Sequence, residues 1–142
     1  MTTVYKLVRE DLTTYNNFQW TIGVPSPSLP GGGICSENVY HAYSHPLLAA
    51  LFAPIHVDDT YSRLFEAEGV VCVLDATKVG CTTITLLTEV PLPPITLEQR
   101  IKIAILAEEK ALARAWTTTA TARAIDLVAV IKTVVFDDNA NR

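Results

Sequence analysis

Two acidic side chains are the first feature of this sequence that could do chemistry. Glu66 and Glu68 are two residues apart in a segment typical of a β-strand, so both project from the same face. Paired carboxyl groups can divide the roles of general acid and general base when burial raises the pKa of one of them. We favour the alternative that they form the solvent face of a strand whose Phe65 and Ala67 face the core. Leu64 shares the side of the glutamates and indicates that this face is partly covered.

The histidines raise the question of a metal site. His41 and His45 are four residues apart, a spacing that would place both imidazoles on one face of a helix. Ser44 and Pro46 are typical of a helix start, so a strand should end between the two histidines and their rings should point in different directions. A second cluster, on a loop, consists of His56, Asp58 and Asp59. Because no further ligands can be named for either group, we predict no metal site.

Glu108 lies in the middle of an apolar helical face, where a carboxylate is costly unless it is paired. Either it meets a basic partner such as Arg63 or Lys78, or the face is less buried than its neighbours indicate. We favour a structural ion pair or an exposed position over a catalytic role.

The cysteines are three in number and contain no CxxC pair, which argues against a disulfide framework and against a structural zinc site. We interpret Cys35, Cys72 and Cys81 as small buried apolar residues rather than as nucleophiles. Unpaired cysteines and the lack of a signal-like N-terminus favour a reducing, cytoplasmic location.

Composition excludes several classes of protein. The 142 residues suit one domain, and 49% hydrophobic against 18% charged residues predict a real core. A formal net charge of −4 offers no basic surface, so we predict no nucleic-acid partner. No apolar run approaches the roughly 20 residues that span a bilayer, so we predict no membrane partner. The nucleophile elbow, the Walker loop and the GxGxxG turn are all absent from the sequence.

The elements that must position these residues come as strands first and helices last. Runs rich in β-branched and aromatic residues predict strands at residues 3–9, 18–22, 39–43, 63–74 and 78–90. The last two should be adjacent and antiparallel. Residues 23–33 are rich in proline and glycine, which predicts a surface loop. If the function resides near Tyr40, this loop should border that site as a mobile flap.

Three helices are expected. A short, wholly buried one spans residues 47–53, with Ser44 as its N-cap and Pro46 in its first turn. Thr96 and Gln99 form a capping box before a helix at residues 97–116. Its buried face is predicted to consist of Leu97, Ile101, Ala104, Ile105, Leu112, Ala115 and Trp116.

A second apolar stripe predicts another helix after residue 119, although a strand at residues 130–136 is the alternative because that run is mostly β-branched. The predicted fold is therefore a single α+β domain, with a mostly antiparallel sheet in residues 1–92, helices in residues 96–136 and a frayed tail at 137–142.

Several runs resemble a family of small uncharacterised proteins encoded by bacteriophages and prophages. They are YKLVREDLTTYNNFQWTIG, ICSENVYHAYSHPLLAALF, RLFEAEG, KVG and PLPPITLEQRIKIAIL. The resemblance covers about two-thirds of the chain and leaves out the residues after Trp116. It implies an accessory protein of a phage or mobile element, without an activity to carry over.

A second likeness lies within the first. Residues 39–42 followed by a helix are similar to a strand and helix of ADP-ribosyltransferases, in which the tyrosine region packs on the nicotinamide of NAD. This likeness implies Tyr40 and His41 as NAD-binding residues and Glu66, Glu68 or Glu89 as the catalytic carboxylate. The first strand of those enzymes carries a histidine or an arginine, whereas this chain offers Lys6 or Arg9.

We predict a binding or interaction module of phage type, without a cofactor, that acts on a protein partner such as a host factor. The oligomeric state stays open, with a homodimer among the alternatives. An ADP-ribosyltransferase-like enzyme that uses NAD is the first alternative to this function, and a virion or structural component is the second.

Overall fold

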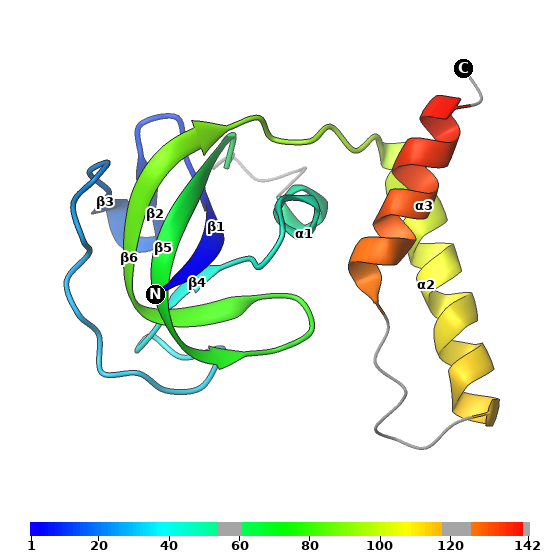
Figure 1. Ribbon diagram of the computed structural model, residues 1–142, viewed down its shortest axis with the longest axis horizontal. Coiled ribbons are helices and arrows are strands. Elements are labelled where there is room, and N and C mark those ends of the chain that lie inside the picture. The colour runs from blue at the N-terminus through cyan, green and yellow to red at the C-terminus, as the bar shows by residue number, and fades with distance from the viewer. Residues whose placement is uncertain (54–60, 118–125, 141–142) are drawn as a thin grey trace. The chain divides into compact units, whose positions relative to one another are not determined.

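The fold is α+β, and the computed structural model describes residues 1–53, 61–117 and 126–140 (Figure 1). The chain divides into two compact units, Met1–Pro93 and Pro94–Arg142. This division falls at the prolines where the sequence changes from strand-rich to helical. The first unit holds the strands and a short helix, and the second holds two long helices.

Four antiparallel strands form the main sheet, in the order β1–β5–β6–β4. Their bounds are Thr2–Val8 for β1, Tyr40–Ala42 for β4, Arg63–Leu74 for β5 and Val79–Val90 for β6. These four strands were predicted, to within a few residues at each end, and β5 and β6 pair as expected. Their β-branched and aromatic residues suit a pleated, half-buried surface.

The two edges of this sheet meet. Tyr5 on β1 and Tyr43, just after β4, exchange backbone hydrogen bonds of 2.8 and 2.9 Å in an isolated antiparallel bridge. The sheet therefore curls into a small barrel, and its curvature is eased by three irregularities in the β5–β6 register. At Gly69 and Gly80 an added Cβ would lie 2.7 Å from a neighbouring side chain, so both positions require glycine for close packing.

The core lies inside the curled sheet, where alternate residues of each strand point inward. Its buried members are Val4, Val8, Trp20, Ala42, Phe65, Ala67, Val79, Cys81, Ile84 and Leu86. A second cluster, of Leu7, Ala49 and Leu64, lies on the other side of β1 and β5, where α1 packs. Because β1 and β5 are buried on both sides, they carry apolar residues at both odd-numbered and even-numbered positions.

A small hairpin that sequence analysis missed follows β1. It consists of β2 (Thr13–Thr14), a 3-10 turn at Tyr15–Asn17 and β3 (Phe18–Gln19), which replaces the longer strand predicted at 18–22. Asn16 and Asn17 adopt φ values of 58° and 57°, which asparagine tolerates better than most residues. Two-residue strands leave too little periodicity in the sequence to be recognised.

The proline- and glycine-rich segment 23–33 is mostly exposed, as predicted, but it is attached to β6. The amide groups of Gly23, Ser26 and Leu29 donate to carbonyl oxygens of β6 at 2.7 to 3.0 Å. The hydroxyl of Ser26 also accepts a hydrogen bond from the amide of Ile84 at 2.9 Å. Proline has no amide hydrogen, so this segment makes spaced hydrogen bonds in place of a continuous ladder.

Helix α1 (Pro46–Phe52) differs from the prediction at its start. His45, not Ser44, is the N-cap, because its Nδ1 accepts a hydrogen bond of 3.1 Å from the amide of Leu47. The imidazole does what a serine hydroxyl would do at this position. The helix is also less buried than expected, since Phe52 is 43% exposed.

Helix α2 (Leu97–Thr117) begins at the predicted capping box: the amide of Gln99 donates to the Thr96 hydroxyl at 3.1 Å, and the Gln99 side chain accepts from the Thr96 amide at 2.9 Å. Helix α3 (Leu127–Ala140) confirms the helix over residues 130–136 and extends it through part of the expected frayed tail. The two helices pack against each other.

The predicted buried face of α2 is wrong at its described members, and the side chains of Leu112, Ala115 and Trp116 lie outside the described residues. Leu97, Ile101 and Ile105 are 62%, 53% and 55% exposed, whereas Gln99 and Ile103 are buried. The helix carries apolar residues on more than one side. The prediction chose the side with more large apolar residues, which is not the buried side. The buried side of α2 is instead the one that carries Ile103. On α3 the buried residues are Val130, Ile131, Val134 and Val135.

Replacing Ile103 by alanine should lower the free energy of unfolding by about 2 to 5 kcal/mol, because it removes buried atoms and leaves a cavity. The matched control, Ile105→Ala, should change it by no more than about 0.5 kcal/mol, because that side chain is largely exposed. Urea titration followed by far-ultraviolet circular dichroism measures both. Equal losses in the two variants would contradict this assignment of the buried face.

Candidate functional site

Lys6 is a buried charged side chain at the centre of the strand unit. It projects to the same side of β1 as Val4 and Val8, which face the core, and only 9% of it is exposed. Its Nζ donates to the carbonyl oxygen of His41 at 2.5 Å, which links β1 to β4. Within the described ranges no carboxylate pairs with Lys6. Burial therefore lowers the pKa of its amine to about 8, an effect that the neighbouring Cys81 thiol partly opposes.

An aromatic cluster packs beside this amine. The ring centroid of Trp20 lies 4.9 Å from that of Phe18 and 5.4 Å from that of Tyr40. Nζ of Lys6 lies 5.6 Å from the Trp20 ring, where the aromatic quadrupole attracts a cation. The indole nitrogen of Trp20 donates to the Thr14 hydroxyl at 2.9 Å. The cluster thus replaces part of the hydration that the Lys6 ammonium loses.

Tyr40 and His41 are neighbours on β4, so their side chains lie on opposite sides of the strand. Tyr40 packs against the core, and its hydroxyl donates to the carbonyl oxygen of Pro27 at 2.7 Å. His41 points the other way, and its Nε2 donates to the carbonyl oxygen of Ile34. The 23–33 segment therefore borders Tyr40, as predicted, but the two proposed NAD-binding residues do not line one surface.

Glu66 and Glu68 lie on the outer side of β5, opposite to the buried Phe65 and Ala67. Leu64, which shares their side, is buried in the cluster near α1, so this face is partly covered. Glu68 is exposed and Glu66 is half-buried. This arrangement agrees with the interpretation of the pair as the solvent face of a strand.

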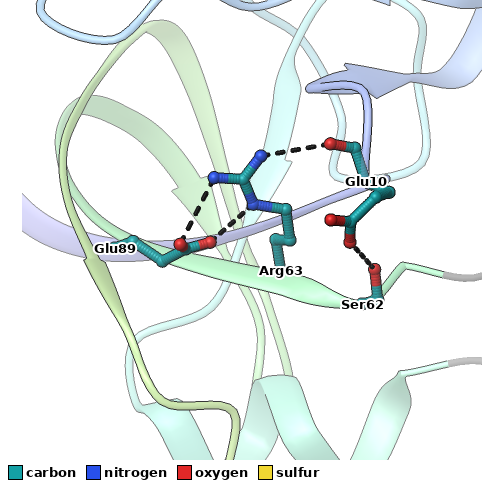
Figure 2. Close-up of polar contacts among 4 residues, drawn as sticks. All are labelled: Glu10, Ser62, Arg63 and Glu89. Atoms are coloured by element: carbon teal, nitrogen blue, oxygen red, sulfur yellow. Dashed lines mark hydrogen bonds and ion pairs between the residues drawn. The ribbon is translucent and has the colours of Figure 1, made fainter.

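Glu89 forms an ion pair with Arg63, as Figure 2 shows. Nε and Nη2 of Arg63 donate to the two carboxylate oxygens at 2.6 and 3.3 Å, and Nη1 donates to the carbonyl oxygen of Glu10 at 3.1 Å. The Ser62 hydroxyl donates to the Glu10 carboxylate at 3.2 Å. The hydrogen bonds from Arg63 lower the pKa of Glu89, so this carboxylate stays ionised.

The register of the sheet separates the proposed NAD-binding and catalytic residues. Tyr40 pairs with Cys81, and Glu89 lies eight residues farther along β6, roughly 26 Å along an extended strand. Glu66 and Glu68 project from the outer side of the sheet, away from the core on which Tyr40 packs. The structure thus brings Lys6 and the aromatic cluster together and keeps the three glutamates apart from Tyr40.

The other candidate residues lie elsewhere. Glu108 is exposed on α2, which confirms the second of the two alternatives for it, and Arg63 pairs with Glu89 instead. The prediction for the cysteines is right for Cys81 and wrong for Cys35 and Cys72, which are exposed.

Metal ligands and membrane spans were searched in the described residues. No group of three or more histidine, cysteine, aspartate or glutamate side chains there could hold a metal ion. His56, Asp58 and Asp59 lie outside the described residues. None of the helices in the described ranges is long and apolar enough to cross a membrane.

Comparison with known proteins adds no relative. No family model, no curated protein and no solved structure matches the chain. Function must therefore be argued from the arrangement of the residues alone.

The buried amine is the chemically unusual group of the strand unit. An amine with a pKa of about 8 is partly neutral near neutral pH, and a neutral amine can act as a base or nucleophile. Here the amine is enclosed and hydrogen-bonded to the backbone, so its geometry fits a contact that positions β1 against β4. The sequence suggested Lys6 only as a replacement for the histidine or arginine of ADP-ribosyltransferases. Its spacing of two residues from Val4 and from Val8 on the same strand was the sign that its side chain is buried.

Lys6 should make stability depend on pH. Its folded pKa, about 8, is lower than the usual value of 10.5, so the unfolded chain binds more protons between these values and stability rises with pH. Replacement of Lys6 by methionine should raise stability at pH 7, and this gain should shrink by about 3 kcal/mol between pH 8 and pH 10.5.

Urea titrations of both proteins across this range measure the effect. The Cys81 thiol, whose pKa burial raises to about 11, lowers stability above pH 9, and Lys6 partly opposes this rise in its pKa. Both proteins should therefore carry Cys81→Ala, so that only the Lys6 amine differs between them. A difference between the two proteins that stays constant with pH would contradict the burial of a titrating amine.

Proposed function

We propose that this chain is a protein-interaction module, in keeping with the phage accessory protein that its sequence resembles, and that it binds its partner through the face of α2 that α3 leaves uncovered. The observation that carries the proposal is a stripe of three large apolar side chains, Leu97, Ile101 and Ile105, each more than half exposed. We call it the α2 stripe. Its members are spaced by four residues, so they lie one above another on one side of the helix.

A row of this kind is typical of a helix that inserts into an apolar groove. Single exposed apolar residues are common on protein surfaces, but aligned ones mark interaction sites. Partners of such helices contact anchors at positions i, i+4 and i+7 or i+8. Because α2 already buries Ile103 on another side, its fold does not need the stripe for packing.

The charges around the α2 stripe indicate the chemistry of the partner. Glu98 and Lys102 form an i,i+4 ion pair of 3.6 Å and neutralise each other near the start of the helix. Glu108 and Glu109 are exposed at the far end of the stripe. The chain as a whole carries a net charge of −4. We therefore infer a protein partner with an apolar groove that has lysine or arginine at one end.

The placement of the other candidate residues favours binding over catalysis. An ADP-ribosyltransferase-like enzyme needs an aromatic side chain and a carboxylate that converge on one bound ribose. Glu89 pairs with Arg63, and Glu66 and Glu68 project from the outer side of β5. A melting temperature that rises with millimolar NAD, and that no longer does so in Glu68→Ala, would favour the enzyme instead.

Photocrosslinking tests the binding proposal. Benzoylphenylalanine placed at Ile101 in the full chain, expressed in bacterial cells, should crosslink one protein of defined mass. The same group at Val24, an exposed apolar residue of the 23–33 segment, is the control and should not. Crosslinking to a second copy of the chain, or to nothing, would overturn the proposal of a different protein as partner.

The crosslinked protein, once purified, should bind the unmodified chain, and the double variant Ile101→Glu, Ile105→Glu should weaken that binding at least about 30-fold, because it removes apolar burial and adds charge. Glu108→Gln, Glu109→Gln should weaken it less, with a smaller dependence on salt. Val24→Glu should leave it unchanged. Isothermal titration calorimetry measures the affinity of the unmodified chain and of the three variants. If Ile101→Glu, Ile105→Glu bound as tightly as the unmodified chain, the α2 stripe would be ruled out as the binding site.

A further inference from the structure

The contact between β1 and β4 that closes the barrel is held by few hydrogen bonds. Tyr5 and Tyr43 exchange two, and no other backbone pair joins these strands among the described residues. Strand β4 is three residues long, whereas β1 pairs with β5 over all seven of its residues. We call the contact of β1 with β4 and Tyr43 the β1–β4 seam.

Lys6 takes the place of a missing step in this seam. In an antiparallel ladder, hydrogen-bonded pairs recur at every second residue of each strand, so the pair after Tyr5–Tyr43 would be Leu7–His41. Within the described part of the chain, Leu7 and His41 exchange no backbone hydrogen bond. The carbonyl oxygen of His41 accepts from Nζ of Lys6 instead. The two strands therefore diverge beyond the bridge, and a side-chain amine spans the gap.

The groups around this amine do not balance its charge. On β6 the Cys81 thiol is near it, and on β4 the Tyr40 hydroxyl donates to a backbone carbonyl, while the His41 imidazole projects to the other side of the strand. The residue opposite Lys6 on β5 is an apolar ring, and Trp20 supplies another. The ammonium is therefore better solvated when water reaches it through an open seam.

We propose that Lys6 controls the β1–β4 seam: protonation of its amine favours a locally open form in which β1 and β4 separate, and the neutral amine favours the closed form. The ladder between β5 and β6 stays intact in the open form. Opening breaks two backbone hydrogen bonds and the contact of Lys6 with His41, each of modest net value. This proposal does not depend on the function of the α2 stripe.

Proton linkage sets the direction of the effect. The pKa of the Lys6 amine is about 8 in the closed form, against the usual value of 10.5 for a hydrated lysine. The open form therefore binds more protons between these values, and opening is favoured as the pH falls. The equilibrium constant for opening should be about tenfold larger at pH 7 than at pH 9.

Hydrogen exchange followed by nuclear magnetic resonance measures this opening. The amides of Tyr5 and Tyr43 report on the seam, because each donates across it. In the full chain with Cys81→Ala, their protection factors should be at least about tenfold smaller than those of the β5–β6 ladder and should rise about tenfold from pH 7 to pH 9. Arg63 and its partner Glu89 keep their charges over this range.

Protection at Tyr5 and Tyr43 equal to that of the β5–β6 ladder would overturn the proposal, because the seam would then open only when the whole strand unit unfolds. In Lys6→Met the protection factors of the two amides should no longer change between pH 7 and pH 9. Lys132→Met, which removes an exposed lysine of α3, is the matched control and should keep the tenfold change. A change that persists in Lys6→Met would exclude Lys6 as its cause.

A covalent link across the seam provides an independent test. Residues that exchange both hydrogen bonds in an antiparallel pair have Cα atoms about 5.5 Å apart, which suits a disulfide. The variant Tyr5→Cys, Tyr43→Cys, with Cys35→Ser, Cys72→Ser and Cys81→Ala, can therefore be compared with itself, oxidised and reduced. Oxidation should raise protection at positions 5 and 43 to the level of the β5–β6 ladder, and reduction should reverse this rise. Equal protection in the two forms would contradict local opening of the seam.

Discussion

The bridge between Tyr5 and Tyr43 is the constraint on which the rest of the strand unit depends. It joins the two edges of the sheet, so each strand has one side that faces the enclosed core and one that does not. That division decides the environment of every candidate residue. It turns Lys6 and Tyr40 toward the core and leaves His41, Glu66 and Glu68 on the other side. Without closure the ammonium of Lys6 would face water and would need neither the carbonyl of His41 nor the ring of Trp20.

Much of the fold could be predicted because several signals agree for each long element. The β-branched runs of β5 and β6 and the capping box of α2 are local features, and the structure has them at the expected places. The short elements could not be predicted, since β2 and β3 hold two residues each. The N-cap of α1 was also missed, because histidine fills a role that serine usually fills.

The candidate site could be predicted less well, because it depends on which residues meet across the sheet. Parity along a strand placed Glu66 and Glu68 correctly on an outer side. The same rule separates the side chains of Tyr40 and His41, although the likeness to ADP-ribosyltransferases implied that both bind NAD. The pairing of Glu89 with Arg63 depends on register between distant segments, which local patterns do not contain. The face of α2 was mistaken for a related reason. A helix with apolar residues on two sides does not show which side its neighbour α3 leaves uncovered.

The chemistry of the α2 stripe limits what it can bind. The α2 stripe presents side chains alone, because the backbone groups of a helix interior are already paired, so it needs a partner with a shaped apolar groove. The proposal of a different protein as partner follows from this need, because a groove of that shape must be supplied by the partner.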